Sequence, residues 1–235
     1  MKKFLKAVRE ELFPTDLTCD ICGRETFGAN ICEDCAKTLI YNDKEVCPVC
    51  GRRTVRSEFC AECKEKPPVF EMAVSAFVYE GGAVILVKKF KEGAGYLKEY
   101  FADEICKKLK DLPEYDCIVC VPMTRRAKYK RGFNQSELLA KAVSERAGKP
   151  HIKGAVEKRK ETGEQKNLSR KERSKNLSGI FRTVKREEVK GKRVLVVDDI
   201  LTTGATADEM AKSLLKAGAK DVYLATVASV EYKIK

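Results

Sequence analysis

Histidine is nearly absent from this sequence, which contains a single one, His151, among 235 residues. A serine or cysteine nucleophile that needs a histidine base therefore has only this candidate, and no motif of such enzymes accompanies it. His151 follows Gly148-Lys149-Pro150, a segment typical of a loop. We therefore expect a surface histidine rather than a catalytic one.

Long apolar runs are missing as well, and no stretch is long enough to span a bilayer. The chain begins Met1-Lys2-Lys3 like a secretory signal peptide, but charged residues soon interrupt the apolar stretch that such a peptide needs. The apolar residues before Pro14 are instead spaced as one face of a short amphipathic helix. We expect this helix to pack against the protein, and we expect the protein to be cytoplasmic.

Negative charge is in the minority, with 35 Asp and Glu against 47 Lys and Arg, so the formal net charge is +12. This excess favours anionic partners, either phosphates or nucleic acid, and carries no information about the fold. We expect many of these charges to be solvated surface.

Cysteine, by contrast, is abundant and regularly spaced. Eight of the eleven cysteines form four Cys-x-x-Cys pairs, and adding 28 to the numbers of the first two pairs gives the last two. The duplicated unit reads C-x2-C-G-R-x7-C-x2-C. A Cys-x-x-Cys turn directs two thiolates at one tetrahedral centre, and two such turns complete a closed, structural metal site. The expected zinc ligands are Cys19, Cys22, Cys32, Cys35, Cys47, Cys50, Cys60 and Cys63.

The spacing leaves the pairing and the number of zinc ions, one or two, open. Sequential ligation closes the shorter loops, so we expect the first four cysteines to share one metal and the last four another. Interleaved sites are the alternative, as is a second site without metal. A disulfide framework would suit a small secreted protein better than this chain. The other cysteines should be small buried hydrophobes: Cys106, Cys117 and Cys120.

Strands and helices alternate after Pro67-Pro68, which marks the end of the cysteine-rich part. The apolar patterns predict strands at 72–79, 117–121, 194–197 and 222–230, and helices at 83–91, 97–109, 135–147 and 205–217. Such alternation favours an α/β fold with a mostly parallel sheet covered on both faces. We expect an N-terminal helix and zinc module over 1–66 and an α/β domain over 69–235.

The segment Val194–Thr206 contains a phosphate-binding pattern. Four apolar residues predict a buried strand, Asp198 and Asp199 follow it, and Thr202-Thr203-Gly204 opens a helix. Ligands of parallel sheets bind at this edge, where the N–H groups and the dipole of the helix favour an anion. The two carboxylates would repel a phosphate, so we expect them to bind sugar hydroxyls, with Mg²⁺ nearby. An ordinary strand followed by a capped acidic turn is the structural alternative.

The whole segment resembles the phosphoribosyl pyrophosphate (PRPP) signature of the type I phosphoribosyltransferases. The resemblance implies that Asp198 and Asp199 hold the ribose hydroxyls. It also implies a loop around the 5′-phosphate, made of Leu201, Thr202, Thr203, Gly204, Ala205 and Thr206.

Two further segments resemble the ComF family of competence-associated proteins, which also carry a cysteine module before a transferase-like domain. They are Arg131-Gly132-Phe133-Asn134-Gln135 with the preceding Val121-Pro122, and the pattern from Thr162 to Phe181. The resemblance covers nearly the whole chain. It implies that the first segment lies at the pyrophosphate end of the site and that the second is a mobile lid. The residues concerned are Arg131, Gly132, Gln165, Arg173 and Asn176. Arg125 belongs to a basic cluster just past the predicted strand at 117–121, where cations would offset the charge of phosphate and pyrophosphate groups.

These patterns and resemblances support two hypotheses about function. The first is phosphoribosyl transfer with release of pyrophosphate, in which Asp198, Asp199 and Arg131 carry the catalysis. The second is a non-catalytic DNA-handling protein that binds single-stranded DNA and uses the PRPP site as a sensor. The ComF resemblance implies a link to DNA uptake and to other competence proteins as partners.

Overall fold

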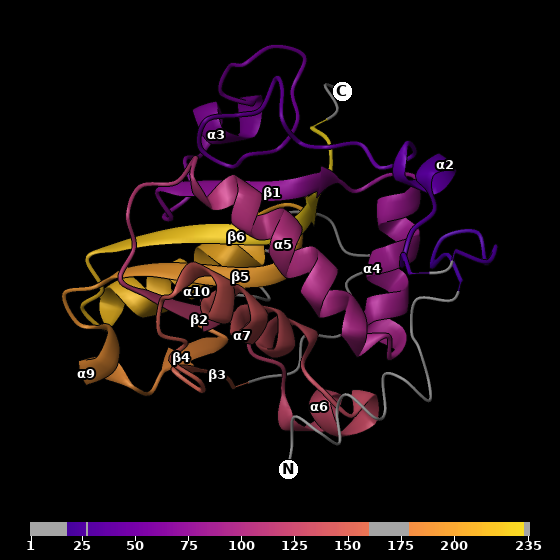
Figure 1. The fold of residues 1–235 in the computed structure, drawn as a ribbon. Helices are drawn as coiled ribbons and strands as arrows, with labels where there is room; N and C mark the ends of the chain where they lie inside the picture. Colours follow the sequence, from indigo (N-terminus) through magenta and orange to yellow (C-terminus); the bar gives the residue numbers. More distant parts are fainter. Residues whose placement is uncertain (1–17, 27, 160–178, 233–235) are drawn as a thin grey trace.

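A four-stranded parallel sheet forms the centre of the computed structural model, which describes residues 18–26, 28–159 and 179–232. Its strands lie in the order β1 (Met72–Val78), β6 (Asp221–Ser229), β5 (Arg193–Leu201) and β2 (Cys117–Cys120) (Figure 1). Every neighbouring pair is parallel. The expected α/β class and the strands predicted from the apolar runs are thereby confirmed. The expected helix before Pro14 lies outside the described residues.

Helices cover both faces of this sheet. Helices α4 (Gly82–Glu92), α5 (Lys98–Leu109) and α7 (Gln135–Ala147) pack on one face, α5 following the short 3₁₀ turn Gly95–Leu97. Helix α10 (Ala205–Lys216) packs on the other face, together with the hairpin of β3 (Val156–Lys158) and β4 (Phe181–Thr183). The strands read as continuous apolar runs because side chains of both orientations are buried. A short helix, α9 (Arg186–Val189), leads into β5.

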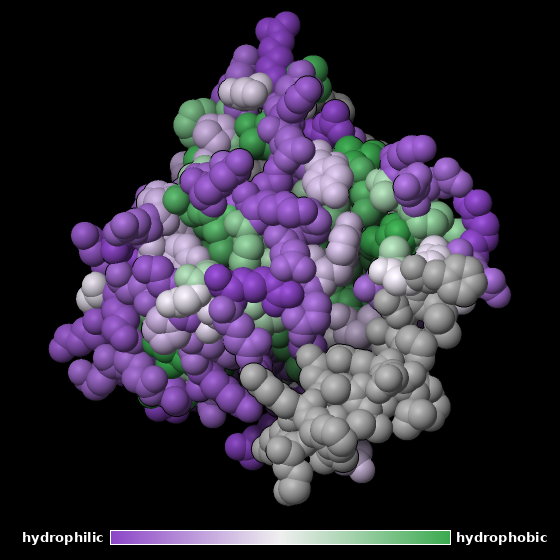
Figure 2. All heavy atoms as spheres, viewed as in Figure 1, coloured by the Kyte–Doolittle hydropathy of each residue, from purple (hydrophilic) through white to green (hydrophobic). Residues whose placement is uncertain are grey.

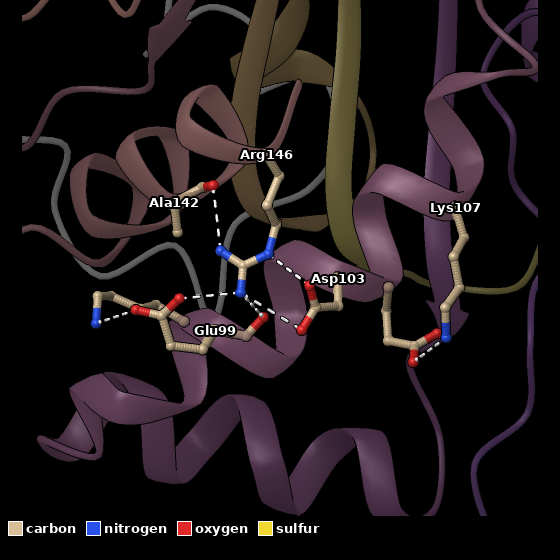
Figure 3. A network of polar contacts seen from close by, with 7 residues as sticks. Glu99, Asp103, Lys107, Ala142 and Arg146 are labelled. Carbon is tan, nitrogen blue, oxygen red and sulfur yellow. Dashed lines mark hydrogen bonds and ion pairs between the residues drawn. The ribbon is translucent and has the colours of Figure 1, made fainter. Parts of the chain in front are cut away.

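Arg146, near the end of α7, joins that helix to α5 (Figure 3). Its guanidinium donates to the carboxylate of Asp103 at 2.5 Å and to the backbone oxygen of Glu99 at 3.1 Å. The side chain of Glu99 also forms an ion pair with it at 2.9 Å. This network fixes the C-terminal end of α7 against α5. The N-terminal end of α7 is the one that reaches the candidate site.

The cysteine-rich module wraps around the β1 edge of the sheet and includes the short helices α2 (Glu33–Ala36) and α3 (Ala61–Glu65). Backbone hydrogen bonds join it to β1, from Asn42 N–H to Ala76 O at 3.0 Å and from Ala73 N–H to Val49 O at 2.8 Å. Its first half packs toward α4, and its second half belongs to the core that α10 also joins. An edge strand that would otherwise be open is therefore covered.

Three details differ from the expectations or refine them. The basic segment after β2, for which the apolar pattern predicts no element, forms a short helix, α6 (Arg125–Arg131). His151 lies beside β2, where its backbone pairs with Ile118, and its side chain is half-buried. Burial lowers the pKa of its imidazole. The expected surface position is therefore wrong. Among the remaining cysteines, Cys117 is fully buried, whereas Cys106 and Cys120 are half-buried.

Charged and polar side chains cover most of the face shown in Figure 2, as the 35% content of charged residues requires. Among the described residues, no helix is long and apolar enough to cross a membrane.

Candidate PRPP site and zinc clusters

The acid pair lies at the point where β5 runs beyond its neighbour β2. The last residue of β2, Cys120, pairs with Val197, so Asp198 and Asp199 extend past the end of β2 while β5 stays paired with β6. The predicted strand is therefore longer than 194–197, and the two acids belong to its last residues. The missing neighbour leaves room for side chains from α4 and α7 to reach the carboxylates.

Three side chains hold the acid pair. Ser136 donates its hydroxyl to Asp198 at 2.8 Å, and Gln135 donates its amide to Asp199 at 2.7 Å. Lys91, at the end of α4, forms an ion pair with Asp199 at 3.3 Å. Asp199 is buried, whereas Asp198 is partly exposed. The pair is thus rigid, with one carboxylate open to a ligand.

Gln135 and Ser136 reach the acids because α7 begins directly beside them. Asn134 caps the helix by accepting a hydrogen bond from the N–H of Ser136 at 3.1 Å. The amide of the same Asn134 donates to the backbone oxygen of Val121, just past β2, at 3.1 Å. The Phe133-Asn134-Gln135 sequence therefore ties the start of α7 to the sheet edge.

A chain of hydrogen bonds links α6 to the acid pair. Arg131 donates to the side-chain oxygen of Gln135 at 2.7 Å, and Gln135 donates in turn to Asp199. Gly132 ends α6 with a φ of +85°, a conformation that strongly favours glycine. Arg131 is consequently held near the carboxylates, although its side chain is exposed, as is that of Arg125 at the start of α6.

Asp198 is an acid with an unusual proton affinity. Burial in the first place, and the negative charge of Asp199 in the second, raise its pKa to about 7. The hydrogen bond from Ser136 acts in the opposite direction. A hydroxyl-rich ligand or a cation that stabilises the carboxylate would relieve this cost.

The loop from Thr202 to Gly204 joins β5 to α10. Gly204 takes a φ of +77° at the N-cap position, and the hydroxyl of Thr203 accepts the N–H of Ala205 at 3.4 Å. Asp198, Thr202, Gly204 and Thr206 line one small hollow of about 20 Å³. The loop expected around the 5′-phosphate and the first acid therefore lie together.

A larger cavity of about 520 Å³ lies on the other side of this loop. Leu201, Thr203 and Gly204 form one wall, and Cys50 and Arg52 of the cysteine-rich module contribute to the opposite wall.

Sequence reasoning missed Lys91 and Ser136, because nothing in the local pattern of α4 or α7 marks them as neighbours of the acid pair. The expected lid residues Gln165, Arg173 and Asn176 lie outside the described part of the chain.

The cysteines lie in two clusters in sequential order. In each cluster the four sulfur atoms all lie within 4.8 Å of one another: Cys19, Cys22, Cys32 and Cys35, then Cys47, Cys50, Cys60 and Cys63. All are free thiols. A tetrahedral zinc site with bonds of about 2.3 Å has edges of about 3.8 Å. The Sγ atoms of Cys22 and Cys32 are 3.8 Å apart, and those of Cys50 and Cys60 are 3.7 Å apart. Both donor sets therefore fit zinc.

Two protein-family models match this architecture. Residues 133–234 match the family model of the phosphoribosyl transferase domain, and residues 8–64 match that of the double zinc ribbon domain. Among solved structures, the chain resembles glutamine PRPP amidotransferase from B. subtilis with a TM-score of 0.40 at 22% identity. The match covers 56% of this chain but only 26% of that structure.

Curated relatives share more of the sequence. The DNA utilization protein YhgH of Salmonella typhi is 33% identical over 165 residues, which are 67% of this chain and 72% of the relative. Competence protein F of Haemophilus influenzae is 34% identical over 52% of this chain and 54% of its own. Competence protein ComFC of Streptococcus pneumoniae is 34% identical over 62% of this chain and 63% of the relative. The chain therefore belongs to the ComF family and carries a double zinc ribbon ahead of a type I phosphoribosyltransferase fold.

Proposed function

We propose that this chain binds PRPP together with Mg²⁺ at the end of β5 and transfers its phosphoribosyl group with release of pyrophosphate. The observation that carries the proposal is the acid pair, which three side chains hold beside the start of α10. An acid with a raised pKa at such a position is costly for the fold, and such costs concentrate at functional sites.

In this proposal Asp198 and Asp199 accept hydrogen bonds from the ribose 2′- and 3′-hydroxyls. Backbone N–H groups from Thr202 to Thr206 bind the 5′-phosphate at the start of α10. Arg131 is anchored through Gln135 and offsets the negative charge that develops on the leaving pyrophosphate, with Arg125 nearby on α6. Mg²⁺, when bound, neutralises part of the charge of the same pyrophosphate.

A thermal-shift titration tests PRPP binding. PRPP with Mg²⁺ should raise the melting temperature, because a ligand specific to the folded state stabilises it. Asp198→Asn combined with Asp199→Asn should abolish this shift and leave the domain folded. Asp221→Asn, at the opposite end of the sheet, is the matched control and should keep the full response. An unchanged response in the double variant would refute the assignment.

Turnover requires a separate measurement. We expect labelled PRPP to release pyrophosphate in the presence of one member of a panel of nucleobases and ammonia. Binding without any product would leave the chain as a PRPP-binding protein.

The second candidate is a DNA-handling function, and one observation favours it. Tyr129 is 93% exposed on α6, where basic side chains surround it. Exposed aromatic rings among cations suit the stacking of single-stranded bases. The relatives named for competence and DNA utilization set the same context, so we propose a role in DNA uptake, in the cytoplasm and with other competence proteins.

We also propose that both clusters hold structural zinc and that the module spans 1–66 and the transferase-like domain 69–235.

A further inference from the structure

The internal duplication extends beyond the cysteines to an arginine–acid pair. Arg24 forms an ion pair with Asp34 at 2.9 Å, and the residues 28 positions later, Arg52 and Glu62, form the equivalent pair at 2.5 Å. Each arginine also contacts a cysteine sulfur of its own cluster. The two ribbons therefore share the same local arrangement of arginine, acid and cysteines.

The two arginines differ in what surrounds them. The Arg24 side chain is 62% exposed, whereas the Arg52 side chain is 8% exposed. Arg52 donates to the sulfur of Cys50 at 3.3 Å and to that of Cys60 at 3.6 Å. Its remaining nitrogen donates to the backbone oxygen of Thr202 at 3.3 Å. One guanidinium thus connects the second cluster to the loop that follows β5.

The second cluster is also the buried one. Cys47, Cys50, Cys60 and Cys63 are all buried and belong to the same core as Phe70, Leu201 and α10. In the first cluster Cys22 is exposed and Cys32 half-buried. A change in the second cluster therefore has packed neighbours through which it can act, and these neighbours include the strand end and the helix that enclose Thr202–Gly204.

The geometry points to Arg52 as a positioning residue through which the second zinc ribbon, and not the first, sets the conformation of the Thr202–Thr206 loop. This inference rests on the proposed function in so far as that loop binds the 5′-phosphate of PRPP.

The peptide bond provides the physical link. A trans peptide is planar, and its C=O and N–H groups point in opposite directions. The hydrogen bond from Arg52 holds the carbonyl of Thr202 toward the zinc ribbon, so the N–H of Thr203 is directed away from it. That N–H is one of the donors that the proposed phosphate site needs. Four sulfurs gathered on one metal fix the acceptors of Arg52, and their dispersal would release the guanidinium and with it the loop.

The duplication supplies matched controls for the test. Arg52→Gln and Arg52→Lys remove or shorten the link, and Arg24→Gln is the equivalent change in the other ribbon. Lysine keeps the charge but lacks the planar fork that spans two sulfurs and a carbonyl. Cys63→Ser and Cys35→Ser disrupt the second and the first cluster at equivalent positions. Zinc content is measured for every variant by elemental analysis.

The first readout needs no PRPP. NMR order parameters of the Thr203 and Gly204 amides should fall from about 0.85 to below about 0.6 in both Arg52 variants and in Cys63→Ser. They should stay unchanged in Arg24→Gln and Cys35→Ser. An unaffected loop in both Arg52 variants would overturn the inference, as would equal loosening by Arg24→Gln.

The second readout is the dissociation constant of PRPP with Mg²⁺, which should rise at least about tenfold in Arg52→Lys and stay within about twofold in Arg24→Gln. If the wild-type protein binds no PRPP, the proposed function fails, while the order parameters still decide whether Arg52 positions the loop.

Discussion

The carboxylate of Asp198 lowers the stability of the folded protein when it is ionised. Folding takes it into a partly buried position beside Asp199, and this raises its pKa to about 7. Because the folded-state pKa lies above the unfolded value of about 3.9, the folded chain binds the proton more tightly. The stability that this proton provides is complete below about pH 4 and is lost as the pH rises toward 7. At neutral pH and above, the ionised Asp198 is therefore a liability for the fold.

Asp198→Asn removes that liability and keeps an oxygen that can accept from Ser136. At pH 8.5 we expect a melting temperature a few degrees above wild type, since 1 kcal/mol corresponds to about 2–4 °C in a chain of this size. At pH 6 the difference should shrink, because Asp198 is then largely protonated. Differential scanning fluorimetry of wild type and variant at each pH measures this difference in melting temperature. An Asp198→Asn protein less stable than wild type at pH 8.5 would contradict this account.

At the scale of elements, the close approach of the second ribbon to β1 depends on a glycine. Gly51 has a φ of +63°, and a Cβ placed there would lie 2.2 Å from the carbonyl oxygen of Ala73. Gly23, the equivalent residue of the first ribbon, has a φ of +76° and nothing within 4 Å of such a Cβ. The duplicated sequence therefore uses the same glycine twice but requires close packing at only one of the two positions.

Replacing these glycines should separate backbone strain from packing. Gly23→Ala should cost about 1–2 kcal/mol, the strain of a left-handed conformation for an L-residue. Gly51→Ala adds a collision with backbone atoms of β1, so its melting temperature should fall clearly further. Thermal unfolding of both variants, with zinc content measured in parallel, tests this. Equal losses would show that the ribbon does not press on β1.

At the scale of the whole molecule, the positive charge and the aromatic ring of α6 form a candidate surface for DNA. The net charge of +12 is distributed over the surface, but α6 combines cations with an exposed aromatic ring at the edge where PRPP is proposed to bind. We expect weak binding of single-stranded DNA with little sequence preference, and a steep loss of affinity with added salt, because each neutralised phosphate releases counterions.

A salt titration of DNA binding, with and without PRPP, tests this surface. Arg125→Gln with Lys130→Gln should reduce the slope of log affinity against log salt by about 0.7 for each lost phosphate contact. Tyr129→Ala should weaken binding through lost stacking. Lys216→Gln, exposed on α10, is the control for loss of charge alone. PRPP should compete if both ligands use α6. No DNA binding even at low salt would favour phosphoribosyl transfer without a DNA-binding role.

The parts of this protein that are local in the chain could be predicted from sequence. A Cys-x-x-Cys turn and a strand–Asp-Asp–Thr-Thr-Gly–helix segment are each made by consecutive residues, so their chemistry is visible as spacing. The alternation of apolar strands with helices likewise indicated the parallel sheet, because strands that are covered by helices on both faces are apolar along their whole length. The register of β2 against β5 has no such local signal.

Only the tertiary structure decided what surrounds those motifs. Lys91 and Ser136 meet the acid pair because β2 ends one residue short of it, an outcome of strand pairing rather than of local pattern. Arg24 and Arg52 each follow a Cys-Gly pair, and yet only Arg52 contacts Thr202, because the second ribbon is the one that shares a core with α10. Residues distant in the chain become partners through packing, and identical motifs acquire different roles from what they are packed against.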